Sequence, residues 1–119
     1  MMGRIPPKLR RQLSSDPYYK TCALKHAISG HVCEGRVTWE HAIIYAGRQV
    51  QERWAIVPIC ERYHLGDKFI KDIGVWIAFN RATLSELEAF PRGYKAWLQK
   101  RRYLNKLYGQ YSEPKTGSL

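Results

Sequence analysis

The sequence predicts an α+β domain whose front half contains short strands and whose back half is helical. Two patterns predict this. β-branched and aromatic residues gather in the segments 36–41 and 54–59, and apolar residues recur at helical spacing from position 67 onward. The 119 residues fit one domain. Because a chain of this length buries a limited core, we expect a staple such as a bound metal to supplement it.

A basic arm is expected at the N-terminus, over residues 1–17. Prolines at both ends of it break regular structure, and Lys8 to Leu13 suits one or two helical turns. The arm is either a disordered tail or a cationic segment that lies on phosphates. Residues 18–108 are expected to form a single domain, and the polar residues 109–119 to form a flexible tail.

The front half is predicted to contain two strands joined by a turn. The first strand covers Arg36 to His41 and can extend to Tyr45. A turn is expected at 46–48. The second strand covers Trp54 to Ile59, and a short helix is expected to begin near Pro58, because proline is tolerated in the first turn of a helix.

The back half is predicted to contain three helices. The first runs from Asp67 to Asn80, where apolar residues keep helical spacing. Thr83 and Glu86 form a capping-box pattern that opens a short second helix. Pro91 is expected to separate that helix from a last, basic helix at 94–108.

The charge balance points to a polyanionic partner. The chain carries a formal net charge of +10 and has a pI of about 9.8. Nucleic acid is the expected partner. A membrane surface is the second candidate, but the sequence shows no basic amphipathic helix with an all-apolar opposite face. No apolar run approaches the roughly 20 residues that span a bilayer, and no secretory signal is evident. We therefore expect a soluble, cytoplasmic protein; a basic charge that serves solubility alone is the alternative.

Cysteine and histidine residues are confined to one stretch of the chain. All three cysteines and all four histidines lie between positions 22 and 64. An odd number of cysteines without a signal peptide argues against a disulfide framework. Thiolate and imidazole together suit zinc. Two Cys-x-x-x-His pairs, Cys22/His26 and Cys60/His64, would each share one face of a helix, and Cys33 adds a further soft ligand.

Glu40-His41 ends the first predicted strand, and the segment AIVPICERYH from Ala55 to His64 follows after a loop. In order and spacing, these residues resemble the core of the HNH endonucleases, also called His-Me finger or ββα-metal nucleases. That family has an acidic residue or His before His on a first strand, and later a stretch of the type Asn-Leu-Val-Pro-Leu-Cys-x-x-Cys-His. The resemblance covers Cys33 to His64, about a third of the chain. It implies a small zinc-stapled ββα-metal core, followed here by C-terminal helices, and a protein of the bacterial cell that is encoded by the host or by a bacteriophage.

The resemblance also implies an activity, the metal-dependent hydrolysis of phosphodiester bonds in DNA. It implies His41 as the general base, a role that suits a side chain with a near-neutral pKa. It implies Glu40 and His64 as ligands of a catalytic Mg²⁺ or Mn²⁺. His64 can instead be recruited to the zinc.

For the structural zinc, the resemblance implies Cys22, Cys33 and Cys60 as ligands. A tetrahedral site needs a fourth ligand. We expect His26 in that place, with His31 as the alternative.

The sequence departs from the family pattern at three positions. Ala55 stands where the family has Asn, Tyr63 where it has the second Cys, and Lys25 where it has a second early Cys. The family Asn orients the base or holds the metal loop, so Gln49 or Gln51 would have to substitute for it. A non-catalytic zinc-binding nucleic-acid module is therefore the alternative to a nuclease. A protein-binding regulator is a third hypothesis that no particular residue supports.

Several basic residues are candidates for contacts to phosphates, which position nucleic acid without reading its sequence. The aromatic residues of the front half are expected to pack in the core or around the zinc rather than to stack on bases. The phosphate-binding candidates are Arg36, Arg48, Arg53, Arg62, Lys100, Arg101 and Arg102.

Overall fold

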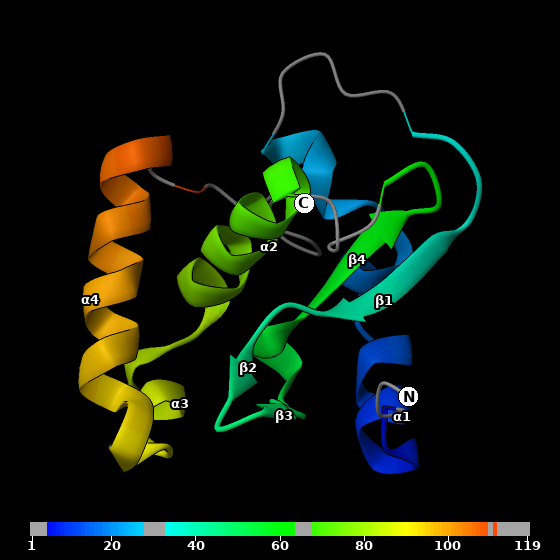
Figure 1. The fold of residues 1–119 in the computed structure, drawn as a ribbon. Helices are drawn as coiled ribbons and strands as arrows, with labels where there is room; N and C mark the ends of the chain where they lie inside the picture. The colour runs from blue at the N-terminus through cyan, green and yellow to red at the C-terminus, as the bar shows by residue number, and fades with distance from the viewer. Residues whose placement is uncertain (1–4, 28–32, 64–67, 110, 112–119) are drawn as a thin grey trace, which may run out of the picture.

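The computed structural model describes residues 5–27, 33–63, 68–109 and 111, with residues 26, 68 and 69 described by their backbone alone. The fold is α+β, as the sequence predicts, with two small two-stranded sheets in the front half and helices at the C-terminal end (Figure 1). In this described part of the chain, no helix is both long and apolar enough to cross a membrane.

The two predicted strands are confirmed and form one antiparallel pair. β1 (Val37–His41) lies beside β4 (Ile56–Cys60), with Trp39 opposite Pro58. Every residue of β4 is buried, because the strand contacts helix α2 (Lys68–Arg81) and two short 3-10 helices, η1 (Pro17–Lys20) and η2 (Ala23–His26). The pair is therefore the centre of the front half.

The helix expected near Pro58 is wrong, because Pro58 lies in the middle of β4. Hydrogen bonds from the Ala42 amide to the Ala55 carbonyl and from the Glu61 amide to the Arg36 carbonyl bracket the ladder. Between these two bonds, hydrogen-bonded residue pairs alternate with non-hydrogen-bonded pairs along the ladder. Pro58 and Trp39 form a non-hydrogen-bonded pair. The missing N–H of Pro58 thus points away from β1 and costs no ladder bond.

A second, smaller hairpin stands between the two strands. β2 (Ile44–Tyr45) pairs with β3 (Arg48–Gln49) around a tight turn. Ala46 and Gly47 both have positive φ angles, of 53° and 77°, as a type I′ hairpin turn requires. The predicted turn is confirmed, whereas the extension of the first strand is wrong, since β2 belongs to a separate sheet.

The first two helices of the back half are confirmed. α2 (Lys68–Arg81) covers the predicted segment, and α3 (Leu84–Glu88) follows a complete capping box. The Glu86 amide donates to the Thr83 hydroxyl at 3.2 Å, and the Thr83 amide donates to a Glu86 carboxylate oxygen at 2.9 Å. This reciprocal pair satisfies two amides that the helix itself leaves without a partner.

The last helix, α4 (Pro91–Tyr108), begins three residues before the predicted position 94. Pro91 starts the helix instead of separating it from α3, because its fixed φ and missing N–H suit the first helical position. Gly93 lies in the first turn, where an added Cβ would come within 2.8 Å of a ring carbon of Tyr45. A glycine at this position lets α4 pack closely against β2.

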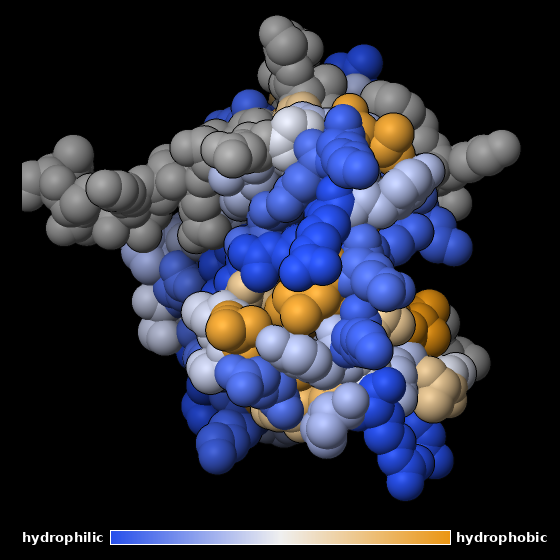
Figure 2. Space-filling view, turned by 90° about the vertical axis from the view of Figure 1, so that its left-hand side faces the viewer, coloured by the Kyte–Doolittle hydropathy of each residue, from blue (hydrophilic) through white to orange (hydrophobic). Residues whose placement is uncertain are grey.

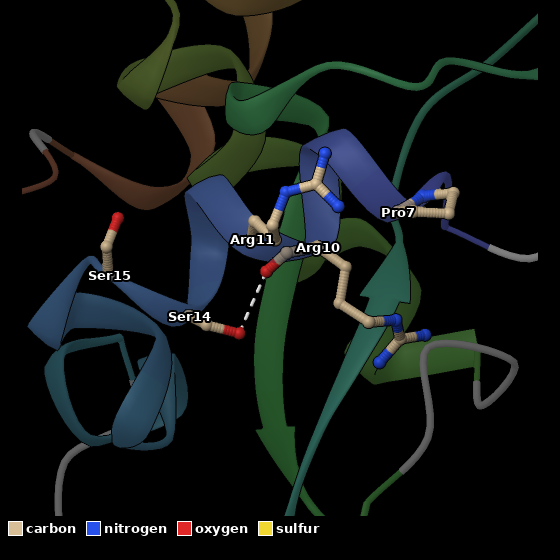
Figure 3. Close-up of a pocket in the computed structure, with 5 residues that line it drawn as sticks. All are labelled: Pro7, Arg10, Arg11, Ser14 and Ser15. Carbon is tan, nitrogen blue, oxygen red and sulfur yellow. Dashed lines mark hydrogen bonds between the residues drawn. The ribbon is translucent and has the colours of Figure 1, made fainter.

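The N-terminal basic segment is anchored to the domain. The predicted helical turns form α1 (Pro7–Ser14), which buries Leu9 and Leu13. Its outward face is polar, and Figure 3 shows Arg10 and Arg11 extending from it in different directions. The inner side of the predicted arm is therefore part of the core, and its positive charge lies at the surface.

Aromatic side chains fill the core where the loop before β4 meets the helices. Trp54 is fully buried. Its ring lies 5.4 Å from that of Trp97 and 6.0 Å from that of Phe79, and the rings of Phe90 and Trp97 are 5.2 Å apart. As the sequence analysis expects of the front-half aromatics, Trp54 packs in the core.

A buried arginine joins the end of α2 to η1. The Arg81 guanidinium carbon lies 3.7 Å from the ring centroid of Tyr18, and Arg81 donates a hydrogen bond to the Tyr19 hydroxyl. Its charge lies 4.0 Å from the Asp16 carboxylate. Tyr18 and Tyr19 are thus also core residues.

Tyr111 also contacts this part of the core. The hydroxyl of Tyr111 lies 2.9 Å from that of Tyr18, and its ring packs edge-on against Trp76 at 5.4 Å. The other residues of the predicted flexible tail at 109–119 lie outside the described residues, except Gly109, which caps α4.

Candidate metal centre and catalytic residues

Three segments bring their cysteines together on one side of the domain. Cys22 precedes η2, Cys33 precedes β1, and Cys60 ends β4. Their sulfur atoms all lie within 4.8 Å of one another. In a tetrahedral site with Zn–S bonds of about 2.3 Å, the sulfurs lie about 3.8 Å apart, so a slight contraction suffices. The three cysteines predicted as ligands therefore form a cluster that could bind a metal such as zinc.

Backbone amides are directed at the sulfurs of this cluster. Because Cys60 belongs to a non-hydrogen-bonded pair, its amide points away from β1, and it donates to the Cys22 sulfur at 3.3 Å. Burial raises the pKa of Cys22 to about 11, although the amides of Cys60 and Leu24 lower it. Burial also disfavours the Cys60 thiolate, yet the amides of Glu34 and Arg62 and the neighbouring thiols lower the pKa of Cys60 on balance. Such amides stabilise the thiolate form that binds metals.

The expectation that helical spacing aligns each Cys-x-x-x-His pair is wrong. Cys60 ends a strand and is followed by a turn, and Cys22 is extended and precedes a 3-10 helix. The backbone of His26 lies in η2, but its side chain is outside the described part of the structure. His31 and His64 lie outside the described residues altogether. The cluster is thus described by its three thiols, without the fourth ligand.

Two ion pairs tie together the segments around Cys60. Arg36 lies 2.8 Å from Glu61, and Arg62 lies 3.5 Å from Glu34. Gly35 has a φ of +79°, and a Cβ there would meet the Cβ of Glu61 at 2.8 Å. The close approach of the two segments depends on this glycine. Two of the predicted phosphate-binding residues, Arg36 and Arg62, therefore have carboxylate partners.

His41 lies at the end of β1 and is held by a glutamine. Its Nε2 atom is 2.7 Å from Oε1 of Gln51. With the glutamine oxygen as the acceptor, Nε2 carries the proton, and Nδ1 retains the lone pair of a general base. Gln51 is one of the two residues considered as substitutes for the family Asn. The side-chain oxygen of the other, Gln49, is buried and has no hydrogen-bond partner among the described residues.

Glu40 projects from the opposite face of β1. Side chains alternate along a strand, and the ladder stays regular through Ala42, so no bend brings the side chains of Glu40 and His41 to one face. The hydroxyl of Thr38 donates to a Glu40 carboxylate oxygen at 3.2 Å. Thr38 was not among the predicted site residues, although a position two residues before Glu40 on a strand shares its face.

The remaining basic candidates fall into two groups. Arg53 donates to both carboxylate oxygens of Glu86, at 2.8 and 3.0 Å, and thereby ties the loop before β4 to α3. The others lie at the surface, and Figure 2 shows the side of the molecule that carries α4 as mostly hydrophilic. Arg48 lies on β3, and Lys100, Arg101 and Arg102 lie on α4.

No family model, no curated protein and no solved structure matches this chain.

Proposed function

We propose that this protein is a metal-dependent endonuclease that hydrolyses phosphodiester bonds of DNA, with a zinc-stapled core of the HNH kind. The observation that carries the proposal is the hydrogen bond between His41 and Gln51 at the end of β1. It fixes one ring nitrogen of the imidazole and leaves the other to accept a proton. Gln51 thereby takes a role that Ala55, at the position of the family Asn, cannot take.

In this proposal, His41 activates water for attack on phosphorus. Its Nδ1 atom takes a proton from the water molecule as the oxygen attacks, and the bond from phosphorus to the leaving oxygen breaks. Mg²⁺ or Mn²⁺, held by Glu40 and His64, would supply stabilisation of the charge on the phosphate oxygens. The half-buried Glu40 carboxylate is a hard oxygen ligand of the kind that these ions prefer.

A structural zinc is the second part of the proposal. The sulfurs of Cys22, Cys33 and Cys60 converge, and soft thiolates select zinc over Mg²⁺ or Mn²⁺. His26, which follows Cys22 by one 3-10 helix, is the proposed fourth ligand. The zinc would join three segments of the described structure that no disulfide links.

The expected substrate is DNA, because the net charge of +10 favours a polyanion. Arg48 and the basic residues at 100–102 are exposed or partly exposed candidates for phosphate contacts. Arg36, Arg53 and Arg62 already pair with carboxylates, so we give them a structural role first. Binding should weaken steeply with salt.

A plasmid-nicking assay with Mg²⁺ or Mn²⁺ tests the activity. We expect His41→Ala to lower the rate by about 10²- to 10⁴-fold, the range for loss of a general base. Zinc content and DNA affinity should stay at the wild-type level, which separates a catalytic defect from misfolding. Leu84→Ala, at an exposed position outside the proposed site, is the control and should cut normally. Unchanged nicking by His41→Ala would contradict the assignment.

A non-catalytic zinc-binding nucleic-acid module is the second candidate. It is favoured by the position of Glu40 and His41 on opposite faces of a regular strand and by a buried Ala55 in place of the family Asn. Salt-dependent DNA binding by the wild-type protein, without cutting in either metal, would support this candidate over the nuclease.

A further inference from the structure

A groove lies between α2 and α4, with a volume of about 690 Å³. Its floor is apolar and includes Val75, Phe79 and Trp97. Lys71 and Lys100, both exposed, stand at its rim on the two helices. Its volume falls in the range of pockets that hold small organic groups, about 300–1,000 Å³.

One end of the groove adjoins the C-terminal end of β1, on the face that carries Glu40 and not His41. Ala42 lines the groove and directly follows His41 in the chain. The hydrogen bond from the Ala42 amide to the Ala55 carbonyl, at 2.8 Å, continues the ladder of β1 and β4. Alternation along the strand therefore places Ala42 on the same face as Glu40. A ligand in the groove would therefore lie on the Glu40 face of β1, the face of one proposed ligand of the catalytic metal.

The groove is lined by cationic, apolar and acidic groups, and a nucleotide has a matching part for each of them. The ammonium groups of Lys71 and Lys100 match phosphates. The apolar floor matches the face and edge of a base, because burying such surface is favourable. Asp72 also lines the groove, and its carboxylate accepts hydrogen bonds, which exocyclic amino groups of bases donate and phosphates do not.

An intact duplex does not present these groups to a groove. Its bases are stacked inside, and a base must be unstacked or flipped before a protein pocket can take it. Ile44, which is 58% exposed, stands at the edge of the groove and adds apolar surface there. The groove is therefore better matched to an unpaired strand than to the outer surface of a duplex.

We propose that this groove binds an unstacked nucleotide of single-stranded DNA beside the scissile phosphate. The inference rests on the proposed function and names its substrate class. Single-stranded or locally opened DNA is preferred to an intact duplex. Lys71 and Lys100 hold the backbone, and the floor at Val75 takes the base.

Fluorescence anisotropy without added divalent ions tests this proposal, since cleavage does not enter the measurement. The probes are a labelled 12-nucleotide single strand and the duplex of the same sequence. Ala96→Trp fills the groove from an exposed position of its lining without changing charge, and Leu107→Trp is the control at an exposed position of α4 away from it. We expect Ala96→Trp to weaken single-strand binding about tenfold and duplex binding less than twofold, an effect of the size that one lost stacked base produces.

A pair of double variants tests the charges. Lys71→Gln with Lys100→Gln removes the two rim charges, and Lys8→Gln with Lys106→Gln removes two exposed charges outside the groove. Both lower the net charge equally. We expect the groove pair to reduce the slope of log affinity against log salt on the single strand by about 1.4, since each phosphate contributes about 0.7. The control pair should change it by less than half as much.

Two results would overturn the inference. One is single-strand binding by Ala96→Trp that equals that of Leu107→Trp; the other is an equal loss on duplex and single strand. The proposed nuclease activity fails by a different result, the absence of wild-type nicking in Mg²⁺ and Mn²⁺. A groove effect without nicking would thus support this binding site and contradict the nuclease, whereas nicking without a groove effect would do the reverse.

Discussion

The front and back halves of this domain are stabilised in different ways. Around the β1–β4 pair, every residue of β1 is only half-buried, and three buried or half-buried thiols meet beside the buried strand β4. In the back half, Trp97 packs against Phe79 and Phe90, and Trp54, which precedes β4, lies against all three rings. We therefore expect a bound metal to contribute to the stability of the front half, whereas the stability of the back half depends on packing.

The largest expected effect is removal of the metal. We expect a strong chelator to destabilise the wild-type protein by roughly 5 kcal/mol or more, because the free energy of metal binding at such sites contributes to folding. Thermal unfolding followed by circular dichroism, with elemental analysis for about one zinc per chain, measures this. Cys60→Ser should start destabilised and respond no further to the chelator. Normal folding of metal-free wild type would remove the difference between the two halves.

Truncation of a buried aromatic ring tests how far the stability of the back half depends on packing. Trp97→Ala should destabilise the protein by about 3–5 kcal/mol, since a large buried ring is replaced by a cavity. The zinc content of the folded protein should stay unchanged, because the thiols lie in the other half. Leu107→Ala, at an exposed position of the same helix, is the control. Loss of zinc together with stability would show that the halves are not independent.

Substitutions of Gln51 test whether this side chain positions His41, the proposed general base. Gln51→Leu removes the acceptor at 2.7 Å from His41, and we expect a ten- to hundredfold lower rate of nicking, about 1.4–2.7 kcal/mol. Gln51→Glu places a negative charge beside the imidazole, which favours the protonated ring. Because the base acts in its deprotonated form, the lower limb of the pH–rate profile should move to higher pH. A profile that stays in place would leave Gln51 with a structural role only.

The smallest expected effect is at the contact between the halves. Glu86→Ala removes the capping box of α3 and the acceptor of Arg53, and the two together should cost about 1–2 kcal/mol. The partly exposed pair with Arg53 contributes the smaller share. Glu88→Ala, on the same helix, is the control. Chemical denaturation measures the change, and a loss far above this range would mean that the Arg53–Glu86 contact couples the two halves.

Local sequence patterns predict much of this fold, and long-range geometry decides the rest. The strands and the capping box at Thr83 follow from residues close together in the chain. The structure differs at Pro58 and Pro91, because the role of a proline depends on where its missing N–H points. At Pro58 that direction is fixed by pairing with Trp39, 19 residues earlier.

The candidate site, too, was predictable from the sequence only in part. The cysteine cluster was predictable, because thiols of one soft-ligand type occur within a short span. The choice of Gln51 over Gln49 as the partner of His41 was not, since it depends on how the β2–β3 hairpin returns the chain. Neither was the groove, which joins residues of α2, α4 and the end of β1.

The direction of the amides in β4 also protects the protein from association through its sheet. Three residues of this strand turn their backbone nitrogen away from β1, and a strand edge of that kind commonly recruits another chain. Here the amide of Ile56 donates to the Arg53 carbonyl, Pro58 has no N–H, and the amide of Cys60 donates to the Cys22 sulfur. An incoming strand would find no amide donor along this edge. The cysteine cluster and the proline thereby keep a short apolar strand from seeding aggregation.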